Sequence, residues 1–491
     1  MTASPPSPAP VPSYTARLPL PVSAADLFAW HARPGAFERL TPPWQPVRLD
    51  HYEGIRSGDR AVIRLGTGRA SIRWIAEHRG YSDACARGDG VCTFRDVQVE
   101  GPFASWEHTH EMIPDGPGRS VLRDHVEYEL PLAPVSERVG GWAAERQLER
   151  LFAYRHRVTR EDLRRHAEAG LEPMTVAVTG ASGTIGSALC AFLTTGGHRV
   201  VRLVRSRGEA VALNRSEQER AVYWNVEAGE IDMGALRLAA PDAVVHLAGE
   251  PVYGIAYTEA KKRAIWESRT KGTQLLSRAL AALDTPPRVL VSASASGIYG
   301  DTGSTPVNES DPPGDGFLAD VCTAWEASTG EAEAAGIRVV HARIGLVLTP
   351  AGGLLQKLLL PARLGLAAWP GDGSAFWGWI ALDDAVYALH HLLASSIAGP
   401  VNVSAPTPAP ARAVVKAMGR ALHRPAVLGA PAPVLRWLGG EAADEIMLKS
   451  VRMVPTRLRE DGFRHSYPTL DGALGHLLGS APAPSPRPAL A

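Results

Sequence analysis

The stretch Thr175-Val-Ala-Val-Thr-Gly-Ala-Ser-Gly-Thr-Ile-Gly186 constrains the fold of this chain more than any other. A β-branched run, typical of a strand, is followed by three evenly spaced glycines and then by the apolar segment 187–194, which predicts a helix. Gly180 permits a tight turn, Gly183 lets the backbone approach a pyrophosphate, and Gly186 lets the helix pack close to the strand. Free N–H groups at the helix start then face the phosphates, which predicts a dinucleotide site. The turn residues expected at the cofactor are Gly180, Ser182, Gly183, Thr184, Ile185 and Gly186.

The length, composition and net charge of the chain indicate the class of protein. With 491 residues the chain is long enough for two or three domains, and 45% hydrophobic and 21% charged residues are typical of globular proteins. The formal net charge is zero, so we expect neither nucleic acid nor an anionic membrane as a partner. There is no run of eighteen apolar residues and no basic-then-apolar leader, which favours a cytoplasmic location.

The four cysteines lie far apart in sequence except for one pair. None forms a Cys-x-x-Cys motif, which predicts free thiols in a reducing compartment. Pairing of Cys85 with Cys92 across a hairpin is the alternative. Residues 1–13 and 481–491 are rich in proline, alanine and serine, and we expect them to be disordered tails.

Residues 14–168 follow a pattern unlike that of the glycine-rich stretch. A strand over 14–20 and a short helix over 23–30 precede several segments with strand-like alternation, and a long helical stretch over 135–166 ends the region. This order predicts an α+β helix-grip domain, in which a curved antiparallel sheet folds around one helix. The alternating segments are 61–65, 70–78, 92–99, 105–113 and 120–130.

Three motifs in this region resemble the SRPBCC (START-like, polyketide cyclase-like) superfamily. They are Phe94-Arg-Asp-Val-Gln-Val-Glu-Gly-Pro-Phe103, Trp106-Glu-His108 and Asp124-His-Val-Glu-Tyr-Glu-Leu-Pro131. The resemblance implies a cavity for a small hydrophobic ligand. His108 and His110 share one face of a strand, which would suit a metal ion. Because no carboxylate or cysteine stands at ligand spacing beside them, we expect polar residues lining a cavity and no metal.

From residue 174 to about 430 strands alternate with helices, which predicts a doubly wound parallel sheet of the Rossmann type. A strand over 198–204 ends at Arg205-Ser-Arg207, where an NAD enzyme usually presents a carboxylate to the ribose. A guanidinium there suits the 2′-phosphate of NADP, so Arg205 and Ser206 favour NADP, with NAD as the alternative. Solvated loop arginines are the other interpretation. A strand over 244–247 then leads into further residues expected at the cofactor: Leu247, Ala248, Gly249 and Glu250.

The later motifs carry a second resemblance. Gly180…Gly186, Leu247-Ala-Gly249, Ser294-Ala-Ser-Gly-Ile-Tyr-Gly300 and Arg343-Ile-Gly345 together resemble the extended short-chain dehydrogenase/reductase superfamily, in particular its NAD-dependent epimerase/dehydratase-like group. The end of the chain is similar to a small C-terminal domain of unknown function in a sugar-nucleotide epimerase-like branch. The resemblance implies that residues 431–480 complete a lobe for a small-molecule substrate, where Trp369, Trp377 and Trp379 either stack on it or form a core.

This superfamily uses a Tyr-x-x-x-Lys pair, in which the lysine lowers the pKa of the tyrosine so that the phenol can pass a proton. Counting back from the strand expected over 337–344, in the register usual for the superfamily, places the pair at Val321 and Trp325. Neither side chain can do acid–base chemistry. The remaining catalytic candidates are Ser294, Ser296 and Tyr299, and Glu326 is expected to pair with an arginine at the surface. Two functions stay open: an NADP(H)-dependent oxidoreductase or epimerase, and a non-catalytic NADP(H)-binding sensor or carrier.

Overall fold

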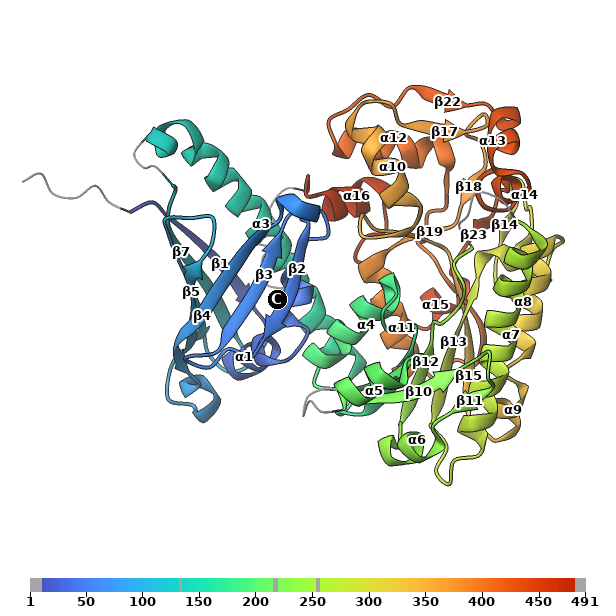
Figure 1. The fold of residues 1–491 in the computed structure, drawn as a ribbon, viewed down its shortest axis with the longest axis horizontal. Helices are drawn as coiled ribbons and strands as arrows, with labels where there is room; N and C mark the ends of the chain where they lie inside the picture. The colour runs from blue at the N-terminus through green and yellow to red at the C-terminus, as the bar shows by residue number, and fades with distance from the viewer. Residues whose placement is uncertain (1–10, 132–134, 215–219, 253–256, 482–491) are drawn as a thin grey trace, which may run out of the picture. The chain divides into compact units, whose positions relative to one another are not determined.

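The structure is a computed structural model that describes residues 11–131, 135–214, 220–252 and 257–481 (Figure 1). The chain divides into two compact units, one that ends at Leu163 and one that spans Arg164–Ala481. The predicted tails, 1–13 and 481–491, lie largely outside the described residues. Within the described ranges, every helix is too short or too polar to cross a lipid bilayer.

The first unit is built on a seven-stranded antiparallel sheet with the strand order β1-β7-β6-β5-β4-β3-β2. One strand, β2, was not predicted, because its register shifts between Leu49 and His51 and the shift breaks the alternation. The strands are β1 (Ser13–Leu20), β2 (Val47–Tyr52), β3 (Arg60–Leu65), β4 (Ile72–Ser82), β5 (Cys92–Glu100), β6 (Ser105–Pro114) and β7 (Ser120–Glu129). The helices are α1 (Ala24–Ala32), α2 (Ala36–Leu40) and α3 (Val135–Ala169), the last of which continues into the second unit.

Helices cover one face of this sheet. Helix α1 begins after Ser23, whose hydroxyl accepts a hydrogen bond from the Asp26 amide at 3.1 Å, as the sequence pattern predicts. Its buried residue Phe28 packs into the core with residues of several strands. Further along the sheet, Phe152 of α3 stacks on Tyr14 of β1 with ring centroids 5.3 Å apart. The alternating strands and the long helix of the sequence analysis are therefore confirmed.

The structure corrects the prediction for one cysteine pair. Cys85 and Cys92 form a disulfide, with Cα atoms 5.0 Å apart, whereas Cys190 and Cys322 are free and buried. The short 3₁₀ turn Ala84–Arg87 brings Cys85 back toward the first residue of β5. The spacing of the two cysteines in the sequence does not reveal this turn, so free thiols were predicted at both positions.

The second unit contains an eight-stranded sheet in the order β11-β10-β9-β8-β12-β13-β15-β20. All neighbours are parallel except β10 and β11, and the order runs outward in both directions from β8 and β12. This is the doubly wound Rossmann arrangement that the sequence predicts. The strands are β8 (Thr175–Thr179), β9 (Arg199–Val204), β10 (Arg220–Asn225), β11 (Glu230–Ile231), β12 (Ala243–His246), β13 (Val289–Ala295), β15 (Arg338–Ile344) and β20 (Gly399–Val403).

Alternate residues of the central strands enter two separate cores. Val176 and Val178 of β8 pack with α4 and α11, whereas Ala177 packs with α6, α7 and α9 on the other face. Figure 1 shows these helix layers on the two sides of the sheet. The helices are α4 (Thr184–Thr195), α6 (Met233–Ala239), α7 (Glu259–Ala281), α8 (Phe317–Ala327), α9 (Gly330–Ala334) and α11 (Leu382–Ala394). Burial on both faces explains the continuous apolar strand sequences.

A further core lies beyond the sheet in the second unit. Helices α10 (Gly353–Arg363), α12 (Ala411–Ala421) and α16 (Leu470–Leu478) pack around Trp377 and Trp379. The Trp379 side chain is fully buried and its indole N–H donates to the Thr407 carbonyl at 2.9 Å. Of the two alternatives from the sequence, both tryptophans therefore take the core position.

Candidate functional site

The glycine turn has the backbone geometry that a phosphate-binding loop requires. Gly180 adopts φ +65°, and a side chain there would approach the Leu247 carbonyl to 2.9 Å. A Cβ on Gly186 would collide with the Gly180 carbonyl oxygen. Gly183 donates to that same oxygen at 2.9 Å and is the N-cap of α4. The first amides of α4 have no partner inside the helix, so they are free to bind an anion.

The neighbouring loop after β12 is tied to this turn by one hydroxyl. Thr179, the last residue of β8, accepts hydrogen bonds from the amides of Leu247 at 3.0 Å and Ala248 at 3.1 Å. The sheet order reverses between β8 and β12, and ligands of such sheets bind outside the carboxyl ends of the strands at the reversal. Gly180 and Ala248 thus meet at the expected crevice.

Sequence reasoning missed one cation at this place. Arg269 of α7 donates to the Glu250 carbonyl at 2.9 Å, and its guanidinium lies 4.9 Å from the ring centroid of Trp325. Burial lowers the pKa of Arg269. A Cβ on Gly249 would come within 3.2 Å of the guanidinium carbon, so glycine makes room for this arginine. The only signal in the sequence was the polar run Ser268-Arg-Thr-Lys in the middle of an amphipathic helix.

The three residues after β9 have two different roles: the serine caps the next helix, and the two arginines carry positive charge. The Ser206 hydroxyl accepts from the Glu209 amide at 3.2 Å and caps the helix α5 (Arg207–Leu213). Arg207 pairs with Glu230 at 2.8 Å and lies over the Tyr223 ring. Arg205 is exposed and has no ion pair or hydrogen bond to any described residue, so its charge is available to a ligand.

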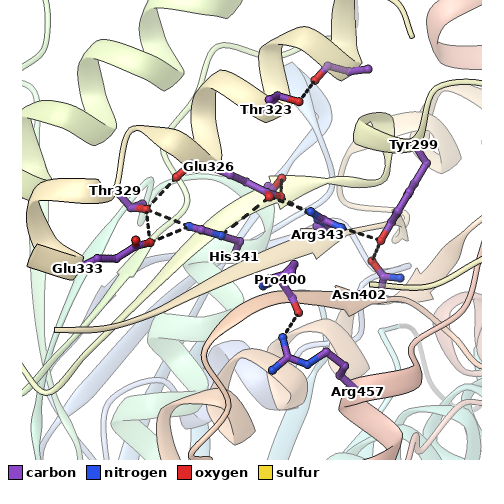
Figure 2. Close-up of polar contacts among 12 residues, drawn as sticks. Tyr299, Thr323, Glu326, Thr329, Glu333, His341, Arg343, Pro400, Asn402 and Arg457 are labelled. Carbon is purple, nitrogen blue, oxygen red and sulfur yellow. Dashed lines mark hydrogen bonds and ion pairs between the residues drawn. The ribbon is translucent and has the colours of Figure 1, made fainter. Parts of the chain in front are cut away.

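Two of the three catalytic candidates are built into a buried network. Ser294 is 3% exposed and donates to Glu326 Oε1 at 2.7 Å. The Tyr299 hydroxyl donates to Asn402 Oδ1 at 2.8 Å and accepts from Arg343 at 3.0 Å, as Figure 2 shows. Burial raises the pKa of Tyr299, which keeps the phenol protonated. Ser296 is partly exposed, so among the three it is the residue most accessible to a ligand.

The centre of this network is a buried ion pair that sequence reasoning placed at the surface. Glu326 of α8 accepts from Arg343 Nε and Nη2, each at 2.9 Å, and the two side chains are 13% and 7% exposed. The Arg343 guanidinium thereby joins Glu326 to Tyr299, and Ser294 is bonded to Glu326 directly. The prediction that Glu326 pairs with an arginine is confirmed, but the predicted surface position is wrong. Helix α8 turns the Glu326 side chain toward β15, where the pair is buried.

Helix α8 holds the positions at which a Tyr-x-x-x-Lys pair was sought. Val321 and Trp325 are both buried, and Val321 packs with Tyr257 and Ile265. Burial also raises the pKa of the adjacent Cys322 thiol to about 11, so that thiol stays protonated. This helix therefore offers no acid or base at the usual place.

One premise of the sequence analysis is contradicted in the first unit. Carboxylates do lie beside His108 and His110: Asp124 Oδ1 is 3.1 Å from His108 Nε2 and 2.8 Å from His110 Nδ1. Asp96 also approaches both rings. The search for ligand spacing along one strand overlooked these carboxylates, because they come from the two adjacent strands.

Comparison with known proteins connects both units to other chains. The sequence profile described as NAD dependent epimerase/dehydratase family matches residues 176–404, and a domain of unknown function, DUF1731, matches residues 430–477. The chain is 40% identical to "Epimerase family protein Mb2239" of Mycobacterium bovis over 302 residues, which are 61% of this chain and 96% of that protein.

Two solved structures are also similar. A nucleoside-diphosphate sugar epimerase from Corynebacterium glutamicum is 30% identical, with a TM-score of 0.76, over 96% of this chain and 91% of that one. Human epimerase family protein SDR39U1 (isoform 2), solved with NADPH, is 28% identical with a TM-score of 0.55, over 63% of this chain and all of the human one. The first match extends over both units, whereas the second is limited to a length close to that of the second unit.

Proposed function

The chain belongs to the NAD dependent epimerase/dehydratase family, and on this basis we propose that it binds NADP(H) at the β8–β12 crevice and acts as an oxidoreductase or epimerase on a small molecule. The observation that carries the proposal is the glycine turn at the head of α4. At Gly180 and Gly186 a Cβ would overlap backbone atoms of the protein itself, so only glycine lets the turn pack this tightly at the start of α4. A pyrophosphate fits such a cradle of free backbone amides.

Arg205 supports NADP over NAD. It is exposed at the end of β9, where the 2′-phosphate of the adenosine ribose would lie, and it has no partner among the described residues. A guanidinium makes charge-assisted hydrogen bonds to phosphate. The human relative that was solved with NADPH agrees with this preference.

The residues proposed to hold the cofactor are those predicted from the sequence. Gly180 and Gly183 would shape the turn, the backbone amides of Ser182, Thr184, Ile185 and Gly186 would face the phosphates, Arg205 and Ser206 would face the ribose, and Leu247, Ala248, Gly249 and Glu250 would line the crevice. When bound, the nicotinamide supplies a site that accepts or donates hydride. Arg269 lies next to Gly249 and over the ring of Trp325, the residue that stands where the superfamily has its lysine. It therefore supplies a positive charge close to that position.

Around the substrate we assign different tasks to the three candidates. Ser296 is partly exposed at the carboxyl end of β13 and is proposed to contact substrate. Ser294 and Tyr299 are buried and bonded to Glu326 and Arg343, so they are proposed to hold the end of the strand in position.

A second function is favoured by one specific observation. Val321 and Trp325 replace the residues that transfer a proton in the wider superfamily, and both are buried in apolar surroundings. A protein with the same crevice but without this chemistry would bind NADP(H) as a sensor or carrier.

The first unit is proposed to be a helix-grip domain of the SRPBCC type that binds a hydrophobic ligand. The support is its antiparallel sheet and the apolar contact of Leu148 and Phe152 on α3 with Val126 and Tyr128 on β7. A cytoplasmic location is part of the same proposal. The free thiols of Cys190 and Cys322 agree with it, whereas the Cys85–Cys92 disulfide is more typical of an oxidising compartment.

One experiment separates these functions. The full chain is titrated with NADPH and with NADH by calorimetry, and then incubated with reduced cofactor and a panel of nucleotide sugars and carbonyl compounds. We expect saturable binding with NADPH preferred, and consumption of one substrate. Heat from neither dinucleotide would overturn the cofactor assignment. Binding without turnover on any panel member would favour the sensor or carrier.

A further inference from the structure

One face of the sheet in the first unit gathers histidine and aspartate side chains from three adjacent strands. His108 and His110 are alternate residues of β6, so their side chains point to the same face. Asp96 of β5 pairs with His108 in the strand register, and Asp124 of β7 pairs with His110. Cross-strand partners have Cβ atoms about 4.5–5.5 Å apart, so the pairing alone brings the four side chains together.

Three of these side chains form a triangle of donor atoms. One atom each from Asp96, His108 and His110 lies within 4.8 Å of the others. Asp96 Oδ2 is 3.4 Å from His110 Nε2 and 3.7 Å from His108 Nδ1. Donors at about 2.1 Å from a tetrahedral metal ion are about 3.4 Å apart, so both edges are within a few tenths of an ångström of that geometry.

The ring nitrogens that face away from the triangle meet a second carboxylate. Asp124 Oδ1 lies 3.1 Å from His108 Nε2 and 2.8 Å from His110 Nδ1. Histidines that bind a metal usually donate their other N–H to a carboxylate, which fixes the tautomer and the ring orientation. Asp124 is itself held by His156 Nε2, 3.0 Å from Oδ2. Asp124 can therefore orient the His108 imidazole in this way, whereas its approach to His110 Nδ1 is an ion-pair distance without the geometry of a hydrogen bond.

The carboxylate in the triangle is also held from outside. The second oxygen of Asp96 lies 2.8 Å from His78 Nε2, which leaves Oδ2 for the triangle. Aromatic rings wall the histidines, with Phe94 stacked on His110 at 4.3 Å and Phe152 edge-on to His108 at 5.3 Å. The Asp96 side chain keeps about a quarter of its surface exposed, whereas His108 and His110 are buried.

The triangle is surrounded by charged groups of both signs. His108, His110 and Asp124 are buried, and Asp124 and Asp96 are two carboxylates against one arginine, Arg155, that interacts with both. A histidine cluster in the second unit, made of His166, His198 and His390, includes no carboxylate in its donor set. The first cluster is thus the better candidate for a divalent ion.

We propose that Asp96, His108 and His110 bind a divalent transition-metal ion such as Zn²⁺, with Asp124 as the positioning residue for the His108 imidazole. Two imidazoles and one carboxylate are a donor set that suits Zn²⁺ or Fe²⁺. Three protein donors leave a coordination position for water or an oxygen-bearing ligand. The proposal concerns the first unit and does not depend on the dinucleotide site of the second.

The test uses the full chain with a histidine-free affinity tag, stripped of metal by a chelator. Equilibrium dialysis against Zn²⁺ with elemental mass spectrometry is expected to give one Zn²⁺ per chain. Asp96→Asn and His110→Gln are expected to weaken Zn²⁺ binding at least 100-fold, and Asp124→Asn about 10- to 100-fold. The matched controls, His125→Gln on the outer face of β7 and His198→Gln in the second unit, are expected to bind as the unchanged chain does.

Crystals soaked in Zn²⁺ provide a measurement that needs no variant. An anomalous peak at the zinc edge between Asp96, His108 and His110 is the expected result, even if a variant fails to fold. Absence of stoichiometric binding, a peak elsewhere, unchanged affinity in folded Asp96→Asn, or loss of binding in His198→Gln alone would each overturn the proposal.

Discussion

The guanidinium of Arg343 is gripped by both carboxylate oxygens of Glu326, through two hydrogen bonds of 2.9 Å each. Its third nitrogen donates to the Tyr299 hydroxyl at 3.0 Å, so the pair joins α8, β15 and the turn after β13 (Figure 2). Such two-point pairing restricts both position and orientation. The hydrogen bonds of Ser294 and Tyr299 to this pair thus fix the carboxyl end of β13, while Ser296 remains accessible.

Removal of the charge on Glu326 tests how much the Glu326–Arg343 ion pair contributes to the free energy of unfolding. Glu326→Gln leaves the buried Arg343 cation without its counter-ion, and we expect a loss of about 3–5 kcal/mol in stability. Thermal unfolding followed by calorimetry measures it. The matched control is Glu331→Gln, whose partner Arg278 is exposed and whose effect is expected to stay below about 1 kcal/mol. Equal effects of the two substitutions would contradict the assignment of Glu326 and Arg343 as a buried pair.

A methyl group in the glycine turn tests the dinucleotide crevice. In Gly186→Ala the new Cβ collides with the Gly180 carbonyl oxygen, which forces the turn to shift at a cost of about 1–3 kcal/mol. We expect NADPH affinity to fall about 10- to 100-fold, measured by calorimetric titration. Gly330→Ala serves as the control, because a Cβ there meets no atom within 4 Å. Unchanged NADPH affinity in Gly186→Ala would place the cofactor elsewhere.

The choice between the two dinucleotides rests on Arg205. Hydrogen bonds to a charged group contribute about 1.5–3 kcal/mol, so Arg205→Gln is expected to weaken NADPH about 10- to 100-fold and to leave NADH unaffected. Arg207→Gln is the control, since Arg207 already pairs with Glu230. Competition titrations with both cofactors measure the ratio. If the ratio of NADPH to NADH affinity did not move, the arginine would be only a solvated loop charge.

Asp384 makes stability depend on pH. Its carboxylate accepts from the amides of Ser466 at 2.8 Å and Tyr467 at 2.9 Å, but burial raises its pKa to about 7 from the ordinary 3.8. Since the folded pKa lies above the unfolded one, the contribution of Asp384 is fully present below about pH 4 and is lost as pH rises through about 7. Melting midpoints recorded from pH 5 to 8 should fall more steeply for the unchanged chain than for Asp384→Asn. Parallel profiles would mean that Asp384 does not titrate in this range.

The disulfide of the first unit makes a separate prediction. Cys85 and Cys92 are seven residues apart, and closing so short a loop stabilises by about 2 kcal/mol in the chain-entropy account. A reductant should lower the unfolding midpoint of the chain by the corresponding amount. It should leave a Cys85→Ala, Cys92→Ala variant unchanged. If the reductant lowered both midpoints alike, the effect would have another origin.

Local patterns account for what could be predicted in the second unit. The β-branched run 175–179, the glycines after it and the apolar helix are all read within a dozen residues, and the structure confirms the strand Thr175–Thr179 and the helix Thr184–Thr195. Such signals depend only on backbone conformation and on which face of an element is buried, which neighbouring residues encode. The resemblance to short-chain dehydrogenases, and not a local pattern, placed the missing Tyr-x-x-x-Lys pair at Val321 and Trp325, and both residues lie on α8.

The sequence by itself therefore determined the alternation of strands and helices in the second unit and the glycine turn after its first strand. Only the tertiary structure decided which side chains meet: Asp124 lies 14 residues beyond His110, and Arg343 lies 44 residues beyond Tyr299. Strand pairing and helix packing bring these groups together, and no local periodicity records which strands will be neighbours. The ion pair of Glu326 and the histidine–aspartate cluster are consequences of that pairing, because charges enter a core only where a partner from another element is already in reach.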